Sequence, residues 1–262
     1  MQADVVLGWS FAGVPEKARA AFERPTRFIS IPTPANRAYR TQVQALGWPY
    51  AIRGALAKYA PGVEPLRVAL LGFSESCHGV RNLLSSGDGA RVDTVVAIDG
   101  IHTPFVGAKQ VDPATMSAWL EFAKFAVVNE RLMIVTHSSV VPPTFASTTQ
   151  TANYLWHKLT GDSEPFTNPS LPALDAPLTT IKTGGNAATG PGRTVEYPSA
   201  PWLPKKRANG LVILGCKNID TPYGTADHIY QAKTVLPLVL IELLAARWNT
   251  IDPTAPDSVC WV

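Results

Sequence analysis

Short apolar runs alternate along this chain with longer segments of helical spacing, a pattern typical of a parallel β-sheet wrapped by helices. The clearest run, residues 67–72 (Arg-Val-Ala-Leu-Leu-Gly), is almost continuously apolar and suits a central strand buried on both faces. The expected strands are residues 4–8, 26–31, 67–72, 93–98, 132–136 and 211–215. The expected helices are residues 15–22, 37–59 with a break at 47–49, 75–84, 114–128, 147–159 and 229–248 with a kink at Pro237. We therefore expect an α/β fold.

The composition of the chain agrees with a globular protein. Of 262 residues, 46% are hydrophobic and 16% are charged, so a sizeable core can form and a disordered tail protein is excluded. We expect residues 1–262 to form a single domain. The formal net charge is only +3, and the longest basic run is residues 205–207 (Lys-Lys-Arg). A protein that follows the phosphates of a nucleic acid needs a basic surface, so no nucleic-acid partner is expected.

Residues 162–209 interrupt the alternation of strands and helices. They hold eight prolines and four glycines in 48 positions and show little periodicity. A stretch of this length without regular structure is uncommon inside a domain and usually has a function. We expect a Pro/Gly-rich loop or lid beside a cleft.

The chain shows no targeting signal. Residues 1–4 (Met-Gln-Ala-Asp) have neither the basic nor the apolar region of a signal peptide. The apolar stretch 235–241 contains Pro237 and is too short to span a bilayer. These features predict a cytoplasmic protein without a transmembrane segment.

No motif in the sequence points to a cofactor. The cysteines Cys77, Cys216 and Cys260 are widely spaced and form no CxxC pair, so no metal site is expected, although one disulfide remains open. No glycine-rich phosphate-binding motif follows an expected strand. We predict that the protein works without a cofactor.

A candidate nucleophile lies where the clearest strand passes into a helix, in residues 72–79 (Gly-Phe-Ser-Glu-Ser-Cys-His-Gly). A serine on such a sharp turn needs small residues two positions before and after it, and Gly72 and Ser76 meet that need around Ser74. The backbone N–H of Glu75, at the helix start, is then a candidate oxyanion donor. A serine that only caps an ordinary helix would give the same local pattern.

Residues 67–79 resemble the nucleophile elbow of serine hydrolases of the α/β-hydrolase superfamily, such as esterases and lipases, with Ser76 in place of the last glycine of Gly-x-Ser-x-Gly. The resemblance implies an α/β-hydrolase fold, with a mostly parallel central sheet of about six strands flanked by helices. The first strand would correspond to the third strand of the full fold, so the leading N-terminal antiparallel hairpin is expected to be missing. The resemblance also implies a Ser-His-Asp triad and an oxyanion hole.

In that fold the general base follows the last strand and precedes the final helix. Of five histidines only His228 lies there, so the resemblance implies that His228 takes the proton of Ser74. A histidine at a helix start that makes a surface hydrogen bond is the plainer alternative.

The acid of the triad should follow the nucleophile and precede the base. Many members of the superfamily carry it after the fifth strand expected here, but residues 132–161 contain no Asp or Glu. The strand before ends in Asp99, a position that lipases of this fold also use, and Asp99 would orient His228 and stabilise its protonated form. An Asp before a Gly is also common in plain turns. The competing acids are Asp220 and Asp227.

Loops at the carboxyl edge of the expected sheet carry further candidates. The loop after the first strand would supply a second oxyanion donor, the backbone N–H of Phe11 or Ser10. Ligands of open α/β sheets bind at this edge, so aromatic residues there are candidates for an apolar substrate pocket. They are Trp9, Phe105, Trp202 and Tyr223. The alternative is that these rings are the buried undersides of loops.

Residues 137–139 (His-Ser-Ser) occupy the place that the acid takes in many members of the superfamily. We expect hydrogen bonds from them within the neighbourhood of the triad. His102 and His137 end neighbouring strands, but no third metal ligand lies nearby in the sequence.

Together these residues predict a serine hydrolase that cleaves a carboxylic ester through an acyl-enzyme on Ser74. The expected partner is a small molecule or a lipid- or polyester-like acyl substrate. The alternatives are a peptidase or amidase, a thioesterase or an acyltransferase on the same triad, and a binding protein that keeps the fold without activity. The sequence does not separate the enzymes, because their chemistry is shared up to acylation.

Overall fold

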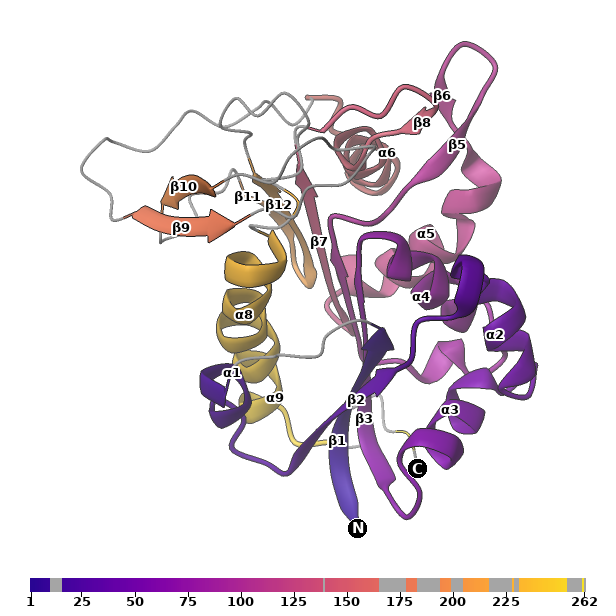
Figure 1. Cartoon of the computed structure of the whole chain (residues 1–262), viewed down its shortest axis with the longest axis vertical. Helices are drawn as coiled ribbons and strands as arrows, with labels where there is room; N and C mark the ends of the chain where they lie inside the picture. Colours follow the sequence, from indigo (N-terminus) through magenta and orange to yellow (C-terminus); the bar gives the residue numbers. More distant parts are fainter. Residues whose placement is uncertain are drawn as a thin grey trace.

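The computed structural model describes residues 1–9, 16–138, 140–164, 178–182, 194–198, 205–216, 228, 231–253 and 261. Seven strands form one sheet in the order β11-β12-β7-β4-β3-β1-β2 (Figure 1). All neighbouring strands in it are parallel except β11 and β12. The strands are β1 (Gln2–Trp9), β2 (Thr26–Ile31), β3 (Glu64–Phe73), β4 (Thr94–Ile98), β7 (Leu132–Ser138), β11 (Lys205–Ala208) and β12 (Leu211–Cys216). The prediction of an α/β fold with a mostly parallel sheet is confirmed.

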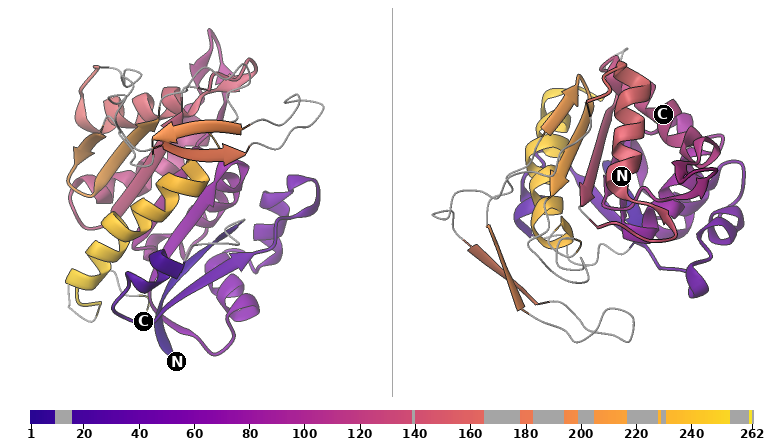
Figure 2. Two further views of the ribbon diagram at one scale, coloured as in Figure 1. Left: turned by 60° about the vertical axis from the view of Figure 1, so that its left-hand side comes forward. Right: turned by 90° about the horizontal axis from the view of Figure 1, so that it is seen from above.

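Helices cover both faces of this sheet, as the view from above shows (Figure 2). One face is packed by α2 (Tyr39–Ala45), α3 (Ala51–Tyr59), α4 (Cys77–Leu84), α5 (Pro113–Val127) and α6 (Thr148–Thr160). The other is packed by α1 (Glu16–Ala20) and the closing helix, which consists of η4 (Gln231–Val235), α8 (Leu236–Val239), η5 (Leu240–Ala245) and α9 (Ala246–Thr250). The short 3-10 turns are η1 (Ala35–Arg37), η2 (Ser74–Ser76) and η3 (Gly89–Arg91).

The two faces of the sheet are built from alternate residues of each strand, because successive side chains of a strand point to opposite sides. In β3, Val68 and Leu70 join one buried cluster, whereas Ala69 and Leu71 join the other. All four side chains are completely buried. This double burial explains why the run at 67–72 is apolar throughout instead of alternating.

The closing helix departs from a regular α-helix on both sides of Pro237. Proline has no N–H to donate and its ring crowds the preceding turn. Here Pro237 stands in the first turn of α8, and the flanking segments η4 and η5 are π-helical. Widened turns thus flank Pro237 on both sides, and a kink at this residue stays a prediction.

Residues 162–209 contain regular structure that their composition did not predict. Within the described parts, β9 (Leu178–Lys182) and β10 (Thr194–Pro198) pair as an antiparallel hairpin, and β11 pairs antiparallel with β12. The expectation of an irregular segment is wrong for these strands. β11 begins with Lys205, Lys206 and Arg207. A charged segment without an apolar run is compatible with an edge strand, but its sequence alone does not predict a strand. A role as a lid stays a prediction.

A small antiparallel sheet lies beyond the carboxyl end of β4. It has the order β6-β5-β8, with β5 (Thr103–Val106), β6 (Gln110–Val111) and β8 (Phe145–Ala146). β8 leads into α6, whose capping residue Ser147 accepts a hydrogen bond from the backbone N–H of Gln150. This cap fixes where Thr148 begins the helix, in agreement with the helix expected over residues 147–159.

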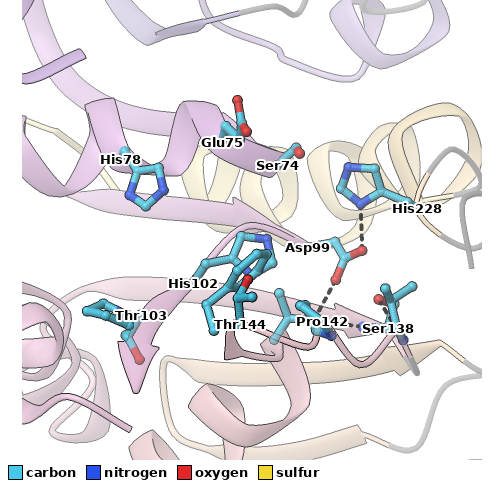
Figure 3. A pocket seen from close by; sticks show the side chains of 14 residues that line it. Ser74, Glu75, His78, Asp99, His102, Thr103, Ser138, Pro142, Thr144 and His228 are labelled. Carbon is cyan, nitrogen blue, oxygen red and sulfur yellow. Dashed lines mark hydrogen bonds and ion pairs between the residues drawn. The ribbon is translucent and has the colours of Figure 1, made fainter. Parts of the chain in front are cut away.

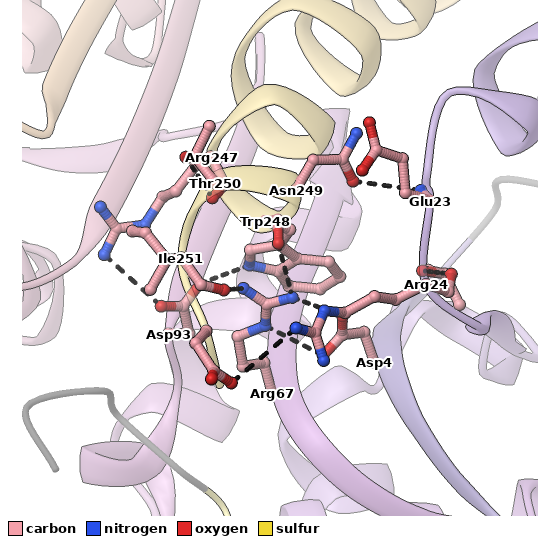
Figure 4. A network of polar contacts seen from close by, with 12 residues as sticks. Asp4, Glu23, Arg24, Arg67, Asp93, Arg247, Trp248, Asn249, Thr250 and Ile251 are labelled. Carbon is pink, nitrogen blue, oxygen red and sulfur yellow. Dashed lines mark hydrogen bonds and ion pairs between the residues drawn. The ribbon is translucent and has the colours of Figure 1, made fainter. Parts of the chain in front are cut away.

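The end of the closing helix is tied to the central strands by a buried polar network (Figure 4). The Arg67 guanidinium of β3 pairs with the Asp4 carboxylate of β1 at 2.6 Å, and both side chains are only 1% exposed. Arg67 also donates to the carbonyl oxygens of Trp248 at 2.9 Å and Ile251 at 3.0 Å. The Trp248 indole N–H donates to Asp93 at 2.6 Å. The strands β1 and β3 and the residue before β4 are thereby joined to the last helix.

Within the described ranges, none of the helices has both the length and the apolar character needed to cross a membrane.

Replacing Asp4 by Asn is expected to destabilise the protein strongly, because it leaves the Arg67 guanidinium buried without its counter-charge. Removing one partner of a buried ion pair costs about 3–5 kcal/mol. Urea unfolding followed by circular dichroism measures this loss. The matched control is Glu121→Gln, which breaks the exposed Lys124–Glu121 pair and should change stability little. Equal effects of the two substitutions would contradict the importance of the buried pair.

Candidate active site

The candidate residues meet at the carboxyl edge of the parallel sheet. The chain runs from β1 outward to β2 and then returns across β1 to β3, so the strand order reverses between β1 and β3. In open α/β sheets, ligands bind in the crevice at such a reversal. Ser74 follows β3 and Asp99 follows the adjacent β4, while His228 lies in the segment after β12. The sheet therefore brings together the three residues that the sequence singled out.

Ser74 occupies a strained turn at the end of β3. Its φ angle is +57°, in the left-handed region that a non-glycine residue rarely adopts. Such strain persists only where the surrounding structure enforces it, and it is concentrated at functional sites. The neighbouring strand supplies part of that constraint, because a Cβ atom on Gly100 would lie only 2.3 Å from the Ser74 carbonyl oxygen. The backbones of the two strand ends are thus in close contact.

Gly72 and Ser76, the small residues on either side of Ser74, are required for different physical reasons. A Cβ atom on Gly72 would lie 2.9 Å from both Cys77 Sγ and Val80 Cγ2, so a glycine lets α4 pack closely on β3. Ser76 is nearly fully buried, and its hydroxyl accepts from the Phe73 N–H and donates to the Phe73 carbonyl oxygen, each at 2.7 Å. The serine in the place of a glycine therefore stabilises the turn.

Asp99 and His228 form a direct hydrogen bond. The His228 Nδ1 atom lies 2.7 Å from Asp99 Oδ2, with the Asp99 side chain 2% and the His228 side chain 29% exposed. Because the carboxylate can only accept, Nδ1 donates, and in the neutral ring Nε2 then keeps its lone pair. Figure 3 shows the other nitrogen of the His228 ring on the side of Ser74. This is the arrangement that a base needs to accept a proton from a serine.

The environment of Asp99 keeps its carboxylate charged. Burial would raise the pKa of this carboxyl, but hydrogen bonds from His228, Thr148 and Ser138 outweigh it and hold the pKa below its usual value. The Thr148 hydroxyl donates to Asp99 Oδ1 at 2.6 Å. Ser138 belongs to the segment from which hydrogen bonds in this neighbourhood were expected, and its backbone N–H donates to the Thr148 hydroxyl at 3.1 Å. Asp99 itself has a φ angle of +42°, so the acid also sits on a strained backbone.

The His228 ring is positioned by stacking as well as by Asp99. It lies against the Phe73 ring, with 4.5 Å between the centroids and 29° between the planes. Phe73 directly precedes Ser74, so the residue before this candidate nucleophile also orients the His228 ring.

A cavity of about 470 Å³ opens at this site and contains all three residues in its wall (Figure 3). That volume falls in the range of small-molecule sites. The apolar part of the wall consists of Pro104, Val140, Pro142 and Phe145. The polar part consists of Ser74, Glu75, His78, Asp99, His102, Thr103, Ser138, Thr144, Thr148 and His228.

Two of the residues expected to line the pocket lie elsewhere. Trp9 is completely buried beneath α4, where a Cβ atom on Gly79 would lie 2.6 Å from its ring, and its indole N–H donates to Gln42 at 2.7 Å. It is a core residue and does not line the cavity. Phe105 is carried outward by β5, where it pairs with Val111 of β6, and it is also not part of the cavity wall.

Other sequence candidates are outside the described residues or only partly placed. Glu75 lines the cavity, and its carboxylate forms an ion pair with Arg37, while the oxyanion role of its N–H stays a prediction. The candidates outside the described residues are Ser10, Phe11, Trp202, Tyr223, Asp220 and Asp227.

The sequence did not single out Thr148 or Phe145 as parts of the site. Thr148 follows the capping serine of α6 and looked like an ordinary first-turn residue. The capping serine was the only available signal, because it marks where α6 begins. In the structure this helix start lies next to the end of β7, where the Thr148 hydroxyl also accepts a hydrogen bond from the Ser138 N–H at 3.1 Å. Phe145 contacts His102 edge to face at 5.0 Å between centroids.

His102 and His137 do not form part of a metal cluster: among the described residues, no three metal-binding side chains converge. His137 Nδ1 lies 2.9 Å from the Thr149 hydroxyl, which donates its own proton to the Ser138 carbonyl oxygen. Nδ1 therefore carries the proton of the neutral ring. Burial lowers the pKa of His137 to about 4.

Comparisons of the chain with protein-family models, with curated proteins and with solved structures gave no match. The assignment of the site therefore depends on its geometry.

Gly100→Ala is expected to destabilise the protein, because the new Cβ atom would stand 2.3 Å from the Ser74 carbonyl oxygen and 2.4 Å from Cys77 Sγ. Overpacking of this kind costs about 1–3 kcal/mol. The free energy of unfolding in urea measures the effect. Gly87→Ala is the control, since the nearest atom to its Cβ is 3.4 Å away. Gly100→Ala with wild-type stability would contradict the close contact of the strand ends.

The stability of the fold should fall between about pH 6.5 and pH 4, partly because of His137. Its pKa is about 4 in the folded protein and near its ordinary value in the unfolded chain, so only the unfolded chain takes up a proton in this interval. The contribution of the neutral His137 to the free energy of unfolding is fully present above about pH 6.5 and is lost as the pH falls towards 4. His137→Gln should flatten the slope of unfolding free energy by about 1.4 kcal/mol per pH unit. The exposed His157 provides the control His157→Gln, and identical slopes in wild type and His137→Gln would contradict the account.

Proposed function

We propose that this protein is a serine hydrolase of the α/β-hydrolase type that cleaves carboxylic esters. The observation that carries the proposal is the 2.7 Å hydrogen bond from His228 Nδ1 to the buried Asp99, at a cavity that also holds Ser74 on its strained turn. Nucleophile, base and orienting acid with these roles recur on unrelated folds, so geometry is the relevant argument.

The order of the strands supports the superfamily as well as the chemistry. The nucleophile follows β3, the acid follows the adjacent β4, and the base follows β12. This chain order of Ser, Asp and His is that of α/β-hydrolases. The positive φ angle of Ser74 is what a nucleophile on a sharp strand-to-helix turn requires.

In the proposed reaction, Ser74 Oγ attacks the ester carbonyl carbon while His228 Nε2 accepts the serine proton. Asp99 stabilises the imidazolium, and the Glu75 N–H with an N–H of Ser10 or Phe11 would bind the oxyanion. Collapse of the tetrahedral intermediate breaks the bond to the alcohol, which takes the proton from His228. Water, deprotonated by His228, then attacks the acyl-enzyme and releases the acid together with Ser74.

The cavity also favours a class of substrate. Its volume of about 470 Å³ and the apolar side chains of Pro104, Val140, Pro142 and Phe145 suit a compact apolar acyl or alcohol group. A small ester, or one unit of a lipid or polyester, meets this description. Amide, thioester or acyl-transfer chemistry would use the same triad.

Hydrolysis of p-nitrophenyl esters tests the proposal. Ser74→Ala should lower kcat by about 10⁴–10⁶-fold, because the nucleophile is lost. Asp99→Asn should lower it by about 10⁴-fold, because His228 is then held in the wrong tautomer. The control Ser85→Ala removes an exposed hydroxyl that bonds only within its own helix turn and should leave kcat unchanged.

Assays of matched anilides and thioesters, and of ester transfer to added alcohols, separate the alternatives. An active wild type whose ester hydrolysis survives in Ser74→Ala would refute the proposal. If Asp99→Asn keeps kcat within a few-fold while Asp220→Asn abolishes activity, the assignment of the acid is wrong.

A further inference from the structure

Gln231 is a buried polar residue that the proposed reaction does not use. It is the first residue of η4, lies three positions after His228 and has no exposed surface. η4 is a π-helical turn, a rare conformation that is frequent at functional sites. Its amide oxygen accepts a hydrogen bond from the Thr136 hydroxyl in the middle of the sheet.

Thr136 connects this amide to the acid of the triad. Its hydroxyl accepts from the Asp99 N–H at 3.0 Å, so its single proton is the one donated to Gln231. The Thr136 carbonyl oxygen accepts from the same N–H at 3.2 Å. Asp99 has a φ angle of +42°, and these two contacts hold its strained backbone in place.

The amide nitrogen of Gln231 is evidence that this residue does more than stabilise the fold. Its Nε2 group is buried and has no hydrogen-bond partner among the described residues. A buried donor without an acceptor opposes folding. An apolar side chain of the same length would remove that donor.

We infer that Gln231 is a positioning residue, which acts through Thr136 to hold the helix start after His228 in register with Asp99. The chain of contacts leads from Gln231 Oε1 to the Thr136 hydroxyl, the Asp99 N–H, and finally from the Asp99 carboxylate to His228 Nδ1. Acid and base come from segments far apart in the sequence, and this buried contact joins the two segments a second time. The kinetic part of the inference rests on the proposed function.

Gln231→Met tests the inference, because it keeps the length of the side chain and removes both polar ends. We expect kcat for a p-nitrophenyl ester to fall about 10²-fold, the effect of a misplacement of about 1 Å in an active site. KM should stay unchanged, since Gln231 does not line the cavity. The melting temperature should stay close to that of the wild type, because the Thr136 hydroxyl loses its acceptor while a donor without a partner among the described residues is removed.

Two companion variants separate positioning from a general loss of stability. Thr136→Val removes the same contact from the other side, so the double variant should lose little more kcat than the more impaired single variant. Leu244→Ala, at a completely buried position of the same helix, lowers stability without touching this chain of contacts and should keep kcat near wild type. Additive losses in the double variant, or an equal loss in Leu244→Ala, would overturn the inference.

A readout independent of catalysis is the low-field proton resonance of His228 Nδ1–H. It should shift or broaden in Gln231→Met and stay in place in Leu244→Ala. An unmoved resonance together with a kcat within two-fold of wild type would overturn the inference, as would a rise in KM alone. If the wild type hydrolyses no ester, the proposed function fails, whereas the resonance still tests the positioning role.

Discussion

The hydrogen bond between Asp99 and His228 is the interaction on which the site depends. It joins two residues that are 129 positions apart and requires a buried carboxylate to stay charged. Thr148 and Ser138 meet that requirement by donating to the same carboxylate. Gly100 adds a second requirement, because its missing side chain allows the strand end that carries Asp99 to touch the turn of Ser74. Asp99, His228 and Ser74 are thereby fixed relative to one another.

The sheet makes this arrangement possible by burying alternate residues of each strand on opposite faces. The cluster around Leu70 holds α4, which follows Ser74, against one face. The cluster around Leu71 holds the helix that follows His228 against the other. At the far end of that helix, Arg67, Asp4 and Asp93 join Trp248 to the central strands. The helix is thus anchored at one end by this network and at the other by Gln231, close to His228.

Much of this architecture could be predicted from the sequence, because buried parallel strands give short apolar runs that are hard to mistake. Ser74 stood out through its small neighbours. Asp99 could be predicted because residues 132–161, the segment that often supplies the acid, contain no Asp or Glu. The charged β11 could not be predicted in this way, because an edge strand needs no apolar run. Trp9 gave the wrong expectation, since a tryptophan at a strand end looks the same whether it faces a cavity or lies beneath a helix. The pair of Thr136 and Gln231 is 95 positions apart, and nothing local marks either residue.

The most direct test of the central claim is to locate the adduct of a fluorophosphonate on the wild-type protein by mass spectrometry. Ser74 and Ser76 lie in the tryptic peptide between Arg67 and Arg81, and fragmentation distinguishes the two serines. We expect a single adduct on Ser74, because the proposed triad activates its hydroxyl through His228, and no adduct after Asp99→Asn at the same exposure time. Labelling at Ser76 or Ser138, or a wild-type protein that stays unlabelled, would contradict it.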